Sequence, residues 1–552
     1  MRLERQFSRL DFGFARFMSE RCKLDGEQKS RFETLLLELS AQQTAGHSCI
    51  RISQEDSLLV AASGLASVGE ISPLVVAENR LYLHRYWLYE QRLARQLVAL
   101  AKQFFVVEQA DSLLSRYFPA ESDEFDWQKQ AAKCAATQGL TIITGGPGTG
   151  KTTTVVKILA LLQEIAEKPL FMALAAPTGK AAMRLQESLA VNKDGLPCPQ
   201  ALKDRIPEKV TTLHRLLGPL PPSPYFKHNA DQPLPYDLIV IDESSMVDLA
   251  LMSKLVDAIK PGGRLILLGD KNQLASVESG AVLADLTHSL PEQTVELLKS
   301  HRFQAGIKQL ASAVNCQLAG EAWQLLQGNE TEVSLLKSDP IAYIVENYLD
   351  YLQLMATGAN FPAIFSAFNS FQVLCSNQYG PNSVSDINLR VEQELSRRQK
   401  IMPSGQWYSG RPVMVTANNA AMQLFNGDIG ICLADAESEG QLRVFFMTGD
   451  GRIKKFLPAR LLACETVFAM TIHKSQGSEF ERILMMLPER FNPVLSKELL
   501  YTGITRAKKQ VKIYAEEAVF TASIAKKVQR YSGLAENLLK FKAEADLVVA
   551  LD

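Results

Sequence analysis

A glycine-rich loop between an apolar run and a helical stretch constrains the fold of this chain more than any other feature. The loop is Gly145-Gly-Pro-Gly-Thr-Gly-Lys-Thr152, and it follows the apolar run Leu140–Thr144. It fits the pattern G-x-x-x-x-G-K-[ST], whose glycines allow backbone N–H groups to turn toward phosphate oxygens at the N-terminus of a helix. The sequence therefore predicts a nucleoside-triphosphate site at the end of a buried strand.

The side chains of this loop predict the binding of ATP and Mg²⁺. We expect Lys151 to reach the β- and γ-phosphates and the Thr152 hydroxyl to bind the magnesium ion. The residues of the loop that we expect to contact ATP are Gly145, Gly146, Pro147, Gly148, Thr149, Gly150, Lys151, Thr152 and Thr153.

Polar side chains at the ends of two later apolar runs add the parts of a hydrolytic site. The run Ile239-Val-Ile-Asp-Glu243 ends in two acids. We expect Asp242 to hold Mg²⁺ through water and Glu243 to polarise the attacking water. The run Leu267-Leu-Gly-Asp270-Lys-Asn-Gln273 ends in an amide, Gln273, which can distinguish ATP from ADP by one hydrogen bond. Acids at strand ends are also common surface residues, so it is their pairing with the loop that favours this interpretation.

Phosphoryl transfer also needs a positive charge beyond the loop lysine, and an arginine of another domain often supplies it. The candidates are Arg302, in Ser300-His-Arg-Phe303, and Arg506, in Tyr501-Thr-Gly-Ile-Thr-Arg506. Most arginines are surface residues. The position of these two in the sequence does not by itself distinguish a catalytic arginine from an exposed one.

The apolar runs predict two α/β regions with parallel sheets. In the first region the expected strands are Leu140–Thr144, Leu170–Ala176, Leu238–Asp242 and Leu265–Gly269. In the second region they are Ala363–Ser376, Arg482–Leu487 and Gln510–Ala515.

Two segments depart from this alternation. Residues 191–236 are rich in proline and polar residues, and we expect an insertion that leaves the first sheet and returns. Pro412–Pro458 has short strand-like runs separated by closely spaced turns, which suggests a small antiparallel barrel inserted in the second region.

Residues 1–117 carry no motif with evident chemistry. Helical periodicity in Arg31–Ser40 and Leu81–Arg116 predicts a helical domain, and the acidic stretch Glu121–Glu124 predicts a linker. Large apolar side chains crowd Leu81–Tyr89, and aromatic residues and arginine commonly anchor interfaces. We expect a partner-docking domain; the alternative is that this segment packs into the core of the first sheet.

Composition restricts the class of protein only loosely. The 552 residues contain 59 Lys and Arg against 60 Asp and Glu, a net charge of -1 that neither indicates nor excludes nucleic acid. No apolar run approaches the roughly 18 residues of a membrane span, and the N-terminus lacks the apolar region of a secretory signal. The eight cysteines are far apart, which argues against a zinc site or a disulfide framework. We expect a reduced, cytoplasmic protein.

Taken in order, these segments resemble the motif set of superfamily 1 helicases, in the subgroup that moves 5′ to 3′. The resemblance covers about residues 125–515 and adds further motifs to those above, namely Trp127-Gln128, Ala176-Pro-Thr-Gly-Lys180, Thr212-Leu-His214 and Thr471-Ile-His473-Lys-Ser-Gln476-Gly-Ser-Glu479. It implies that Gln128 reads adenine, that Glu479 contacts the ribose, and that Arg302 and Arg506 are arginine fingers of the second domain.

More narrowly, the chain is similar to the RecD family, the alpha subunits of exodeoxyribonuclease V (RecBCD). Pro73–Trp87 resembles the N-terminal signature of that family, and Val373–Pro381 resembles a segment of its second domain. The resemblance implies two RecA-like, parallel-sheet P-loop NTPase domains. These would be residues 118–295, with a pin-carrying insertion at 191–236, and residues 296–552, with an SH3-like β-barrel at about 405–462. Residues 1–117 would form a helical domain that docks on the gamma subunit.

The resemblance also implies the substrate and the assembly. ATP would lie between the two domains, and single-stranded DNA across their top, in a heterotrimer whose nuclease site belongs to the beta subunit. The residues implied to contact the DNA backbone are Thr178, Lys180, His214, Thr471 and His473. The expected function is ATP-dependent 5′-to-3′ unwinding of duplex DNA ends in double-strand break repair and recombination.

Three alternatives remain open at this point. The chain could be a free-standing RecD-like helicase, although the Pro73–Trp87 signature favours the complexed form. It could be a nucleotide-binding structural subunit with a decayed motor, although every catalytic candidate keeps its chemistry. It could itself be the nuclease, although no cluster of acids with a nearby lysine stands outside the ATPase motifs.

Overall fold

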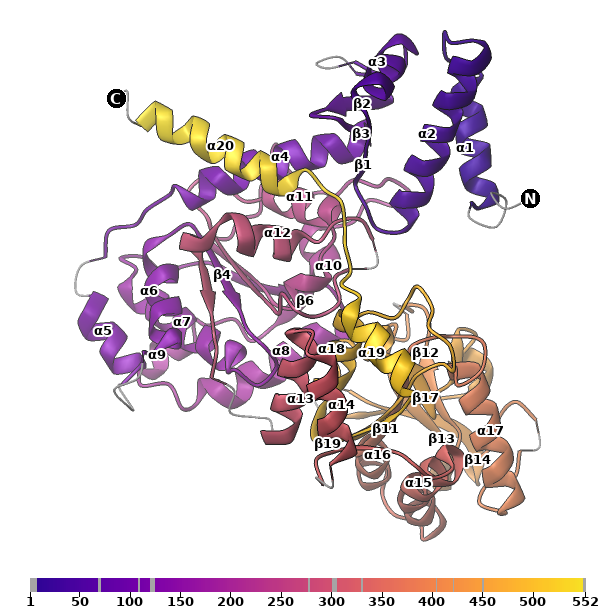
Figure 1. Cartoon of the computed structure of the whole chain (residues 1–552). Helices are drawn as coiled ribbons and strands as arrows, with labels where there is room; N and C mark the ends of the chain where they lie inside the picture. Colours follow the sequence, from indigo (N-terminus) through magenta and orange to yellow (C-terminus); the bar gives the residue numbers. More distant parts are fainter. Residues whose placement is uncertain are drawn as a thin grey trace.

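Two parallel sheets, each with helices packed around it, make up most of this protein, and a smaller N-terminal unit stands beside the first (Figure 1). The structure is a computed structural model. It describes residues 7–67, 71–107, 110–119, 125–276, 278–299, 305–328, 331–403, 405–419, 421–448 and 451–549.

The first sheet has six parallel strands in the order β6-β5-β7-β8-β4-β9. Their bounds are β4 Leu140–Thr144, β5 Met172–Ala176, β6 Val210–Thr212, β7 Leu238–Ile241, β8 Arg264–Gly269 and β9 Thr294–Glu296. The four strands predicted here are confirmed to within two residues at each end. Because all strands run the same way, the loops that follow β4, β7 and β8 meet at one edge of the sheet.

Helices cover both faces of this sheet. One face carries α6 (Trp127–Thr137), α7 (Lys151–Ile165) and α8 (Gly179–Lys193); the other carries α4 (His84–Ala101), α11 (Leu249–Asp257) and α12 (Val282–Ser289). In β4, Leu140 and Ile142 face the second group while Ile143 faces the first. Burial on both faces explains why the strands are continuously apolar rather than alternating.

The predicted insertion at residues 191–236 is wrong in its middle. This segment contains β6, which pairs with β5 at the edge of the first sheet, and α10 (Leu213–Leu217), which follows it. Only the flanking parts leave the sheet, one with α9 (Gln200–Lys203) and one with a bridge between Pro219 and Phe226. A strand of three residues is too short for its pattern to be recognised in a polar, proline-rich context.

The second sheet has five parallel strands in the order β10-β19-β18-β11-β17. Their bounds are β10 Val333–Leu335, β11 Phe371–Cys375, β17 Ala469–Thr471, β18 Phe480–Met486 and β19 Ala507–Tyr514. Its helices are α13 Ala305–Asn315, α14 Ala319–Gln327, α15 Pro340–Ala356, α16 Phe361–Asn369, α17 Val384–Arg397, α18 Lys497–Ile504 and α19 Glu517–Ala525. The strands predicted at Arg482–Leu487 and Gln510–Ala515 are confirmed as β18 and β19.

The prediction of one strand over Ala363–Ser376 is wrong in its first half, which is helix α16. The Asn360 side chain caps this helix by accepting a hydrogen bond of 3.0 Å from the Ala363 N–H, and a proline stands in its first turn. A short, wholly apolar run is equally compatible with a buried strand and a buried helix. The capping side chain of Asn360 is the feature that favours the helix here.

A five-stranded antiparallel sheet is inserted in the second region, in the order β15-β14-β13-β12-β16. Its strands are β12 Pro412–Val415, β13 Ile429–Asp435, β14 Gln441–Met447, β15 Ile453–Phe456 and β16 Cys464–Thr466. Val413, Cys432, Val444 and Phe446 form a separate small core for it. The antiparallel insertion predicted at this place is therefore present as a sheet with its own core.

The N-terminal unit combines helices with a three-stranded antiparallel sheet, β1-β3-β2. Its elements are α1 Arg9–Ser19, α2 Gly26–Thr44, β1 Cys49–Arg51, α3 Gln54–Ala62, β2 Leu74–Ala77 and β3 Arg80–Leu83. The helix predicted at Arg31–Ser40 is confirmed within α2. The continuous helix predicted over Leu81–Arg116 is wrong: it is the end of β3, then α4, then α5 (Ala110–Tyr117).

The boundary predicted at residue 117 is also wrong. Leu93 and Leu97 of α4 lie in the same core as Leu140 and Ile142 of the first sheet, and Tyr117, the last residue of α5, lies in the core on the opposite face. Helices α4 and α5 therefore belong to the first sheet, the alternative left open above, and the separate N-terminal unit ends near residue 83. The linker expected at Glu121–Glu124 lies outside the described residues.

The C-terminal segment returns to the first sheet, so residues 296–552 are not a single unit. Helix α20 (Leu534–Val549) packs against α4 and α12, and Figure 1 shows it lying along α4, far from the second sheet. Leu534 and Leu538 are fully buried in the core shared with these helices.

A buried glutamate, Glu90 of α4, joins three distant parts of the chain. Its carboxylate accepts hydrogen bonds of 2.5 Å from the Ser48 hydroxyl and 3.1 Å from the Gly533 N–H. A Cβ at Gly533 would lie 2.9 Å from a Glu90 oxygen, so only glycine fits beside the carboxylate. Burial raises the pKa of Glu90 to about 7, and the hydrogen bonds from Ser48 and Gly533 limit the rise.

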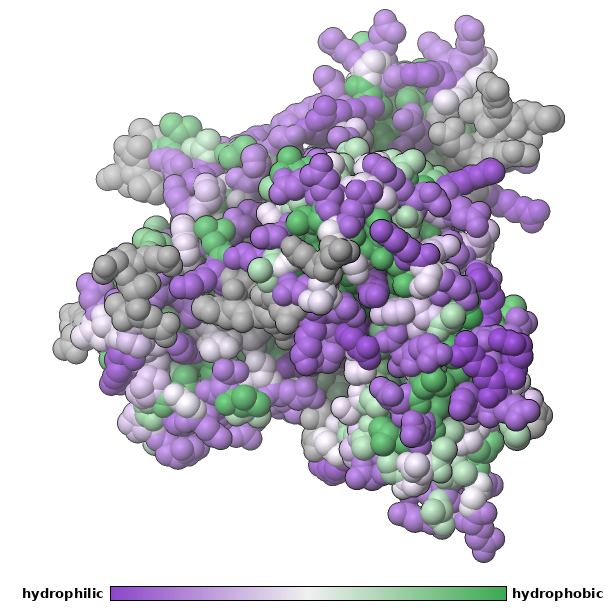
Figure 2. Space-filling model, turned by 60° about the horizontal axis from the view of Figure 1, so that its bottom comes forward, coloured by the Kyte–Doolittle hydropathy of each residue, from purple (hydrophilic) through white to green (hydrophobic). Residues whose placement is uncertain are grey.

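Among the described helices, none combines the length and the apolar character that crossing a membrane requires. Figure 2 shows hydrophilic side chains over most of one face, with hydrophobic residues in separate groups between them.

We predict that the stability of the protein falls as pH rises, because of Glu90. A carboxyl whose pKa is raised on folding contributes its full stability below pH 4.5, its usual pKa, and loses that contribution as pH rises through about 7. A difference of this size corresponds to about 3 kcal/mol. The Tm of the unmodified protein should therefore fall more steeply over this pH range than that of Glu90→Gln, which cannot ionise. The exposed Glu544→Gln serves as control, and parallel Tm profiles for all three proteins would contradict the prediction.

Candidate active site

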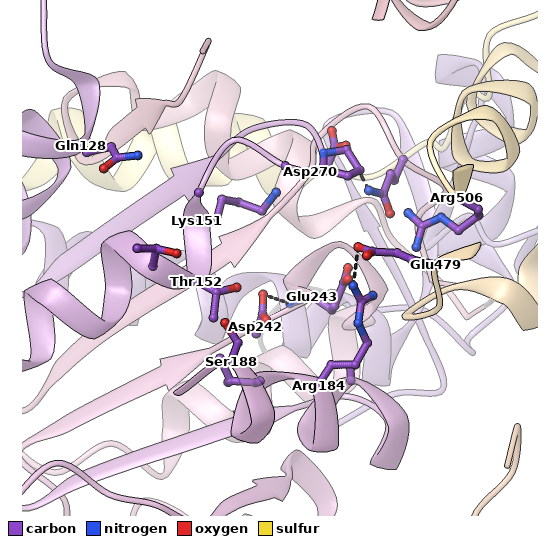
Figure 3. Close-up of a pocket in the computed structure, with 17 residues that line it drawn as sticks. Gln128, Lys151, Thr152, Arg184, Ser188, Asp242, Glu243, Asp270, Glu479 and Arg506 are labelled. Atoms are coloured by element: carbon purple, nitrogen blue, oxygen red, sulfur yellow. Dashed lines mark hydrogen bonds and ion pairs between the residues drawn. The ribbon is translucent and has the colours of Figure 1, made fainter. Parts of the chain in front are cut away.

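A cleft of about 600 Å³ between the two parallel sheets gathers most of the predicted nucleotide-site residues (Figure 3). From the first sheet it is lined by Gln128, Pro147, Gly148, Gly150, Lys151, Thr152, Thr153, Asp242, Glu243, Asp270 and Gln273. From the second it is lined by Glu479 and Arg506. The volume is ordinary for a site that takes a nucleotide-sized ligand.

The loop before α7 has the backbone that its glycines predict. Gly148 and Gly150 both have φ of +78°, the left-handed region that side chains with a Cβ rarely adopt. A Cβ at Gly150 would also lie 2.8 Å from the Gln128 amide nitrogen. Glycine here therefore allows both the turn and the close approach of Gln128, the predicted adenine contact, to the loop.

Lys151, the first residue of α7, bends back over the loop. Its ammonium donates hydrogen bonds of 2.6 Å and 3.0 Å to the carbonyls of Gly145 and Gly146. Gly145 and Gly146 do not themselves line the cleft, and neither does Thr149, whose hydroxyl donates to the Gly146 carbonyl at 2.9 Å. Gly145, Gly146 and Thr149 therefore stabilise the shape of the loop without lining the cleft.

The two acids after β7 occupy a strained turn. Glu243 has φ of +51°, and its N–H donates a hydrogen bond of 2.8 Å to the Asp242 carboxylate. Strained backbone of this kind is commonly found at functional sites. Burial raises the pKa of Asp242 to about 6, with the charge of Glu243 adding to the rise. A cation in the cleft would offset both causes of the raised pKa, the burial of Asp242 and the negative charge of Glu243.

A tyrosine from the second sheet's helices reaches the acid after β8. The Tyr501 hydroxyl of α18 donates a hydrogen bond of 3.0 Å to Asp270, and the Gln273 amide donates to the same oxygen at 3.0 Å. A second link crosses alongside, from the Leu274 N–H to the Thr502 hydroxyl at 2.9 Å. The predicted γ-phosphate sensor is therefore hydrogen-bonded through Asp270 to the second sheet's side of the cleft.

Charged groups of opposite sign face each other across the cleft. Arg506 is buried, and its guanidinium donates to the backbone carbonyls of Thr502, at 3.1 Å, and Ser478, at 3.3 Å. Arg184 of α8 forms an ion pair with Glu479, which Figure 3 marks with a dashed line. Of the two predicted arginine fingers, Arg506 thus lines the cleft, whereas Arg302 lies outside the described residues.

The five predicted DNA contacts do not line this cleft; they lie after β5 (Thr178 and Lys180), after β6 (His214), at the end of β17 (Thr471) and just beyond it (His473). Thr178 caps α8, His214 is exposed on α10, and Thr471 accepts a hydrogen bond from the Lys474 N–H at 3.2 Å. Burial lowers the pKa of Lys180 to about 8 and also lowers that of His473. The positions are compatible with a DNA path along the top of the two sheets.

Sequence reasoning missed one face of α8 and one residue of α18. Ala181, Arg184, Leu185 and Ser188 recur at helical spacing and all line the cleft, and Tyr501 approaches from the other side. Helical periodicity could have identified the face of α8, but not what that face meets.

The family model described as "AAA domain" matches residues 128–279, and the model described as "UvrD-like helicase C-terminal domain" matches residues 466–514. Over 498 residues the chain is 40% identical to the RecBCD enzyme subunit RecD of Mycolicibacterium smegmatis, covering 88% of this chain and 86% of that relative. The chain belongs to the RecD family. The RecBCD enzyme subunit RecD of Haemophilus influenzae is 36% identical over 536 residues, with 85% of this chain and 82% of the relative covered.

The RecD-family chain is also similar to the ATP-dependent RecD2 DNA helicase of Deinococcus radiodurans. The two are 31% identical over 474 residues, which is 83% of this chain but 57% of that protein. Among solved structures, Bacteroides Pif1 bound to ssDNA matches with a TM-score of 0.40 and 18% identity, covering 77% of this chain and 98% of the other.

We predict that Arg506→Ala leaves the affinity for ATP within a few-fold but lowers turnover by about 10³-fold or more, because an arginine finger acts on the transition state. Single-turnover hydrolysis and equilibrium nucleotide binding measure the two effects. Arg506→Lys keeps the charge without the planar guanidinium and should fall between. A large loss of binding with turnover preserved would instead make Arg506 a ground-state contact.

We also predict that Arg184 and Glu479 act as a pair across the cleft. In a double-mutant cycle of Arg184→Ala and Glu479→Ala, the losses in ATP affinity should be non-additive by about 1 kcal/mol or more, because each single change leaves a charge without its partner. The pair Lys271 and Glu296 lies outside the cleft and provides the control cycle. Additive losses at Arg184 and Glu479 would contradict a bridging role.

Proposed function

We propose that this RecD-family chain is an ATP-dependent DNA helicase, the alpha subunit of an exodeoxyribonuclease V (RecBCD) complex with beta and gamma subunits. It would work in the cytoplasm, unwinding duplex DNA ends 5′ to 3′ during double-strand break repair and recombination. The observation that carries the proposal is the shared cleft, because both sheets contribute charged side chains to one nucleotide-sized site and hydrogen bonds cross it.

The residues of the cleft suit Mg²⁺ and ATP. Thr152 and Asp242 supply hard oxygen ligands on one wall, and Mg²⁺ prefers one or two such ligands together with phosphate oxygens and water. Among the described residues there is no group of three or more His, Cys, Asp and Glu that could hold a metal ion. The ion would supply charge that stabilises the transferring phosphoryl group.

In the proposed mechanism the chain's own groups close and open the cleft. Lys151 exchanges its loop carbonyls for the β- and γ-phosphates, Glu243 orients the attacking water, and Arg506 neutralises charge as it develops. Loss of the γ-phosphate removes the charge that holds Arg506 to the first sheet's side, so the two sheets can separate.

Contacts between the sheets link this cycle to DNA. Leu274, directly after Gln273, donates its N–H to Thr502, and its carbonyl accepts from the Gln476 amide at 3.1 Å. Gln476 stands near Thr471 and His473, two of the proposed DNA contacts. Movement at the γ-phosphate would therefore shift one part of the DNA path relative to Thr178, Lys180 and His214, and each cycle would advance the strand.

The smaller units would guide the strand and hold the partner. We assign the antiparallel sheet β12–β16 as the SH3-like barrel expected at about residues 405–462, and the part of 191–236 outside β6 and α10 as the carrier of the pin. The N-terminal unit, ending near residue 83, would dock on the gamma subunit. Leu10 and Phe17 of its helix α1 are 74% and 53% exposed, which suits an interface.

The extent of the relatives favours the complexed form over a free-standing helicase. The chain spans 86% and 82% of two RecBCD subunits but only 57% of the Deinococcus helicase. A purely structural subunit is disfavoured because Lys151, Glu243, Gln273 and Arg506 converge on the cleft.

We predict that Lys151→Ala abolishes DNA-stimulated ATP hydrolysis, because Lys151 is the group placed to neutralise the β- and γ-phosphates. Phosphate release with and without single-stranded DNA measures the effect, in the chain alone and in the reconstituted complex. Lys168→Ala, an exposed lysine beyond the end of α7, is the control. DNA-stimulated turnover near normal in Lys151→Ala would refute both the site and the function.

A further inference from the structure

We infer that a row of cationic and aromatic side chains, running from the inserted antiparallel sheet through the proposed DNA contact His214 and along the first sheet's side, binds single-stranded DNA beyond the motor's other proposed contacts. The inference rests on the proposed function and extends the DNA path to helix α4, which carries no helicase motif in its sequence. We call this surface the aromatic row; it consists of Phe425, Arg215, His214, Phe226, Lys254, Tyr89, Tyr86 and Arg85.

The row is continuous from the proposed DNA contacts to α4. The Arg215 guanidinium lies 5.1 Å from the Phe425 ring, and its neighbour His214 lies 5.7 Å from the Phe226 ring. Lys254 of α11 lies 5.4 Å from the Phe226 ring and 5.7 Å from the Tyr89 ring.

On α4 the row continues from Tyr89 to Tyr86, with ring centroids 6.4 Å apart, and ends where the Arg85 guanidinium lies 4.8 Å over the Tyr86 ring. In Figure 1 the elements that carry the row, α10, α11 and α4, follow one another up the side of the first sheet.

The rings of the row are held in place by packing, whereas most of its cations are exposed to solvent. Tyr86, Tyr89 and Phe226 pack with one side against the core beneath the first sheet and are half-buried, so their positions are set by packing. Arg85, His214 and Arg215 are exposed between them. Bases stack on aromatic rings without regard to sequence while cations hold the backbone, and this is the arrangement that binds single strands.

A hairpin beside the row adds a further ring. It closes through the bridge between Pro219 and Phe226, and Lys254 fixes it to α11 by donating a hydrogen bond of 2.9 Å to the Pro224 carbonyl. Its Tyr225 is 70% exposed, and the pKa of Tyr89 is raised mainly by burial, with a contribution from nearby Tyr225. An exposed tyrosine beside two anchored ones offers a stacking position for a base.

The charges of the row suit a negatively charged occupant. Arg85, Lys254 and Arg215 are positive, and exposed Lys227 follows the hairpin. The carboxylate whose charge reaches Lys254 and Tyr89 is that of Asp248, which already accepts the Leu251 N–H at 2.8 Å as the cap of α11. The cations alternate with rings on which bases can stack, and the row is continuous with the proposed DNA contact His214, so DNA is favoured as the occupant.

The test compares two lengths of labelled oligothymidylate, about 8 and about 30 nucleotides, so that only the longer can reach from the motor to α4. We expect Arg85→Glu and Tyr225→Ala each to weaken binding of the long strand by about 5-fold or more, with little change for the short one. Tyr225→Phe keeps the ring and should bind as the unmodified chain does. Arg85→Glu should also lower the salt dependence of long-strand binding by about one ion.

Lys133→Glu provides the matched control, because it makes the same charge change on α6, which covers the opposite face of the sheet. Equal effects on both strand lengths, or none on either, would overturn the inference. So would variants that bind both strands normally but no longer co-purify with the partner subunits, since the row would then be a protein interface. Normal short-strand binding and DNA-stimulated hydrolysis in the variants would leave the proposed function intact, whereas failure of the unmodified chain to bind either strand would refute both.

Discussion

The buried charges of the nucleotide cleft are the constraint on which the rest of this structure depends. Asp242, Glu243 and Asp270 stand at the carboxyl edge of one sheet, where burial raises the pKa of Asp242 and Asp270. Carboxylates in such a place need cations, and among the described residues that line the cleft the first sheet's side supplies Lys151 and Arg184. The second sheet supplies Arg506, and its Glu479 pairs with Arg184. Opposite charges therefore hold the two sheets in register around the cleft, and a triphosphate with Mg²⁺ would change that balance directly.

The C-terminal segment connects the second sheet to the first sheet and to the N-terminal unit. After completing the second sheet, the chain crosses back, and Arg530 donates hydrogen bonds to the carbonyls of Glu278 and Gly280 on the way. Tyr531 then meets the N-terminal unit, where its N–H donates to His47 at 2.9 Å, and α20 docks on α4. The N-terminal unit, the first sheet and the C-terminus thus meet near Glu90. A partner bound to the N-terminal unit would touch a junction that both ends of the chain share.

Some of this could be predicted from the sequence, for identifiable reasons. The loop ending in Lys151 and Thr152 follows a strand that is buried on both faces, so its apolar run and its glycines carry a strong local pattern. Asp242 and Gln273 follow strands of the same kind. By contrast, the apolar run of α16 lacks periodicity and therefore predicts a strand, and the three residues of β6 carry too little pattern to predict one. The large apolar residues of α4 do not reveal which core they enter, so the sequence predicts a separate domain there.

What the sequence by itself determined is the set of side chains proposed for the nucleotide site, and that parallel strands present them at one cleft. These follow from local geometry, in which a glycine turn and a strand end place neighbouring residues within a few ångströms. What only the tertiary structure decided is which distant surfaces meet: Arg184 with Glu479, Tyr501 with Asp270, α20 with α4, and the alignment of Arg85 with His214. These contacts join residues hundreds of positions apart or on separate elements, and they depend on how helices pack on sheets rather than on any pattern within one segment.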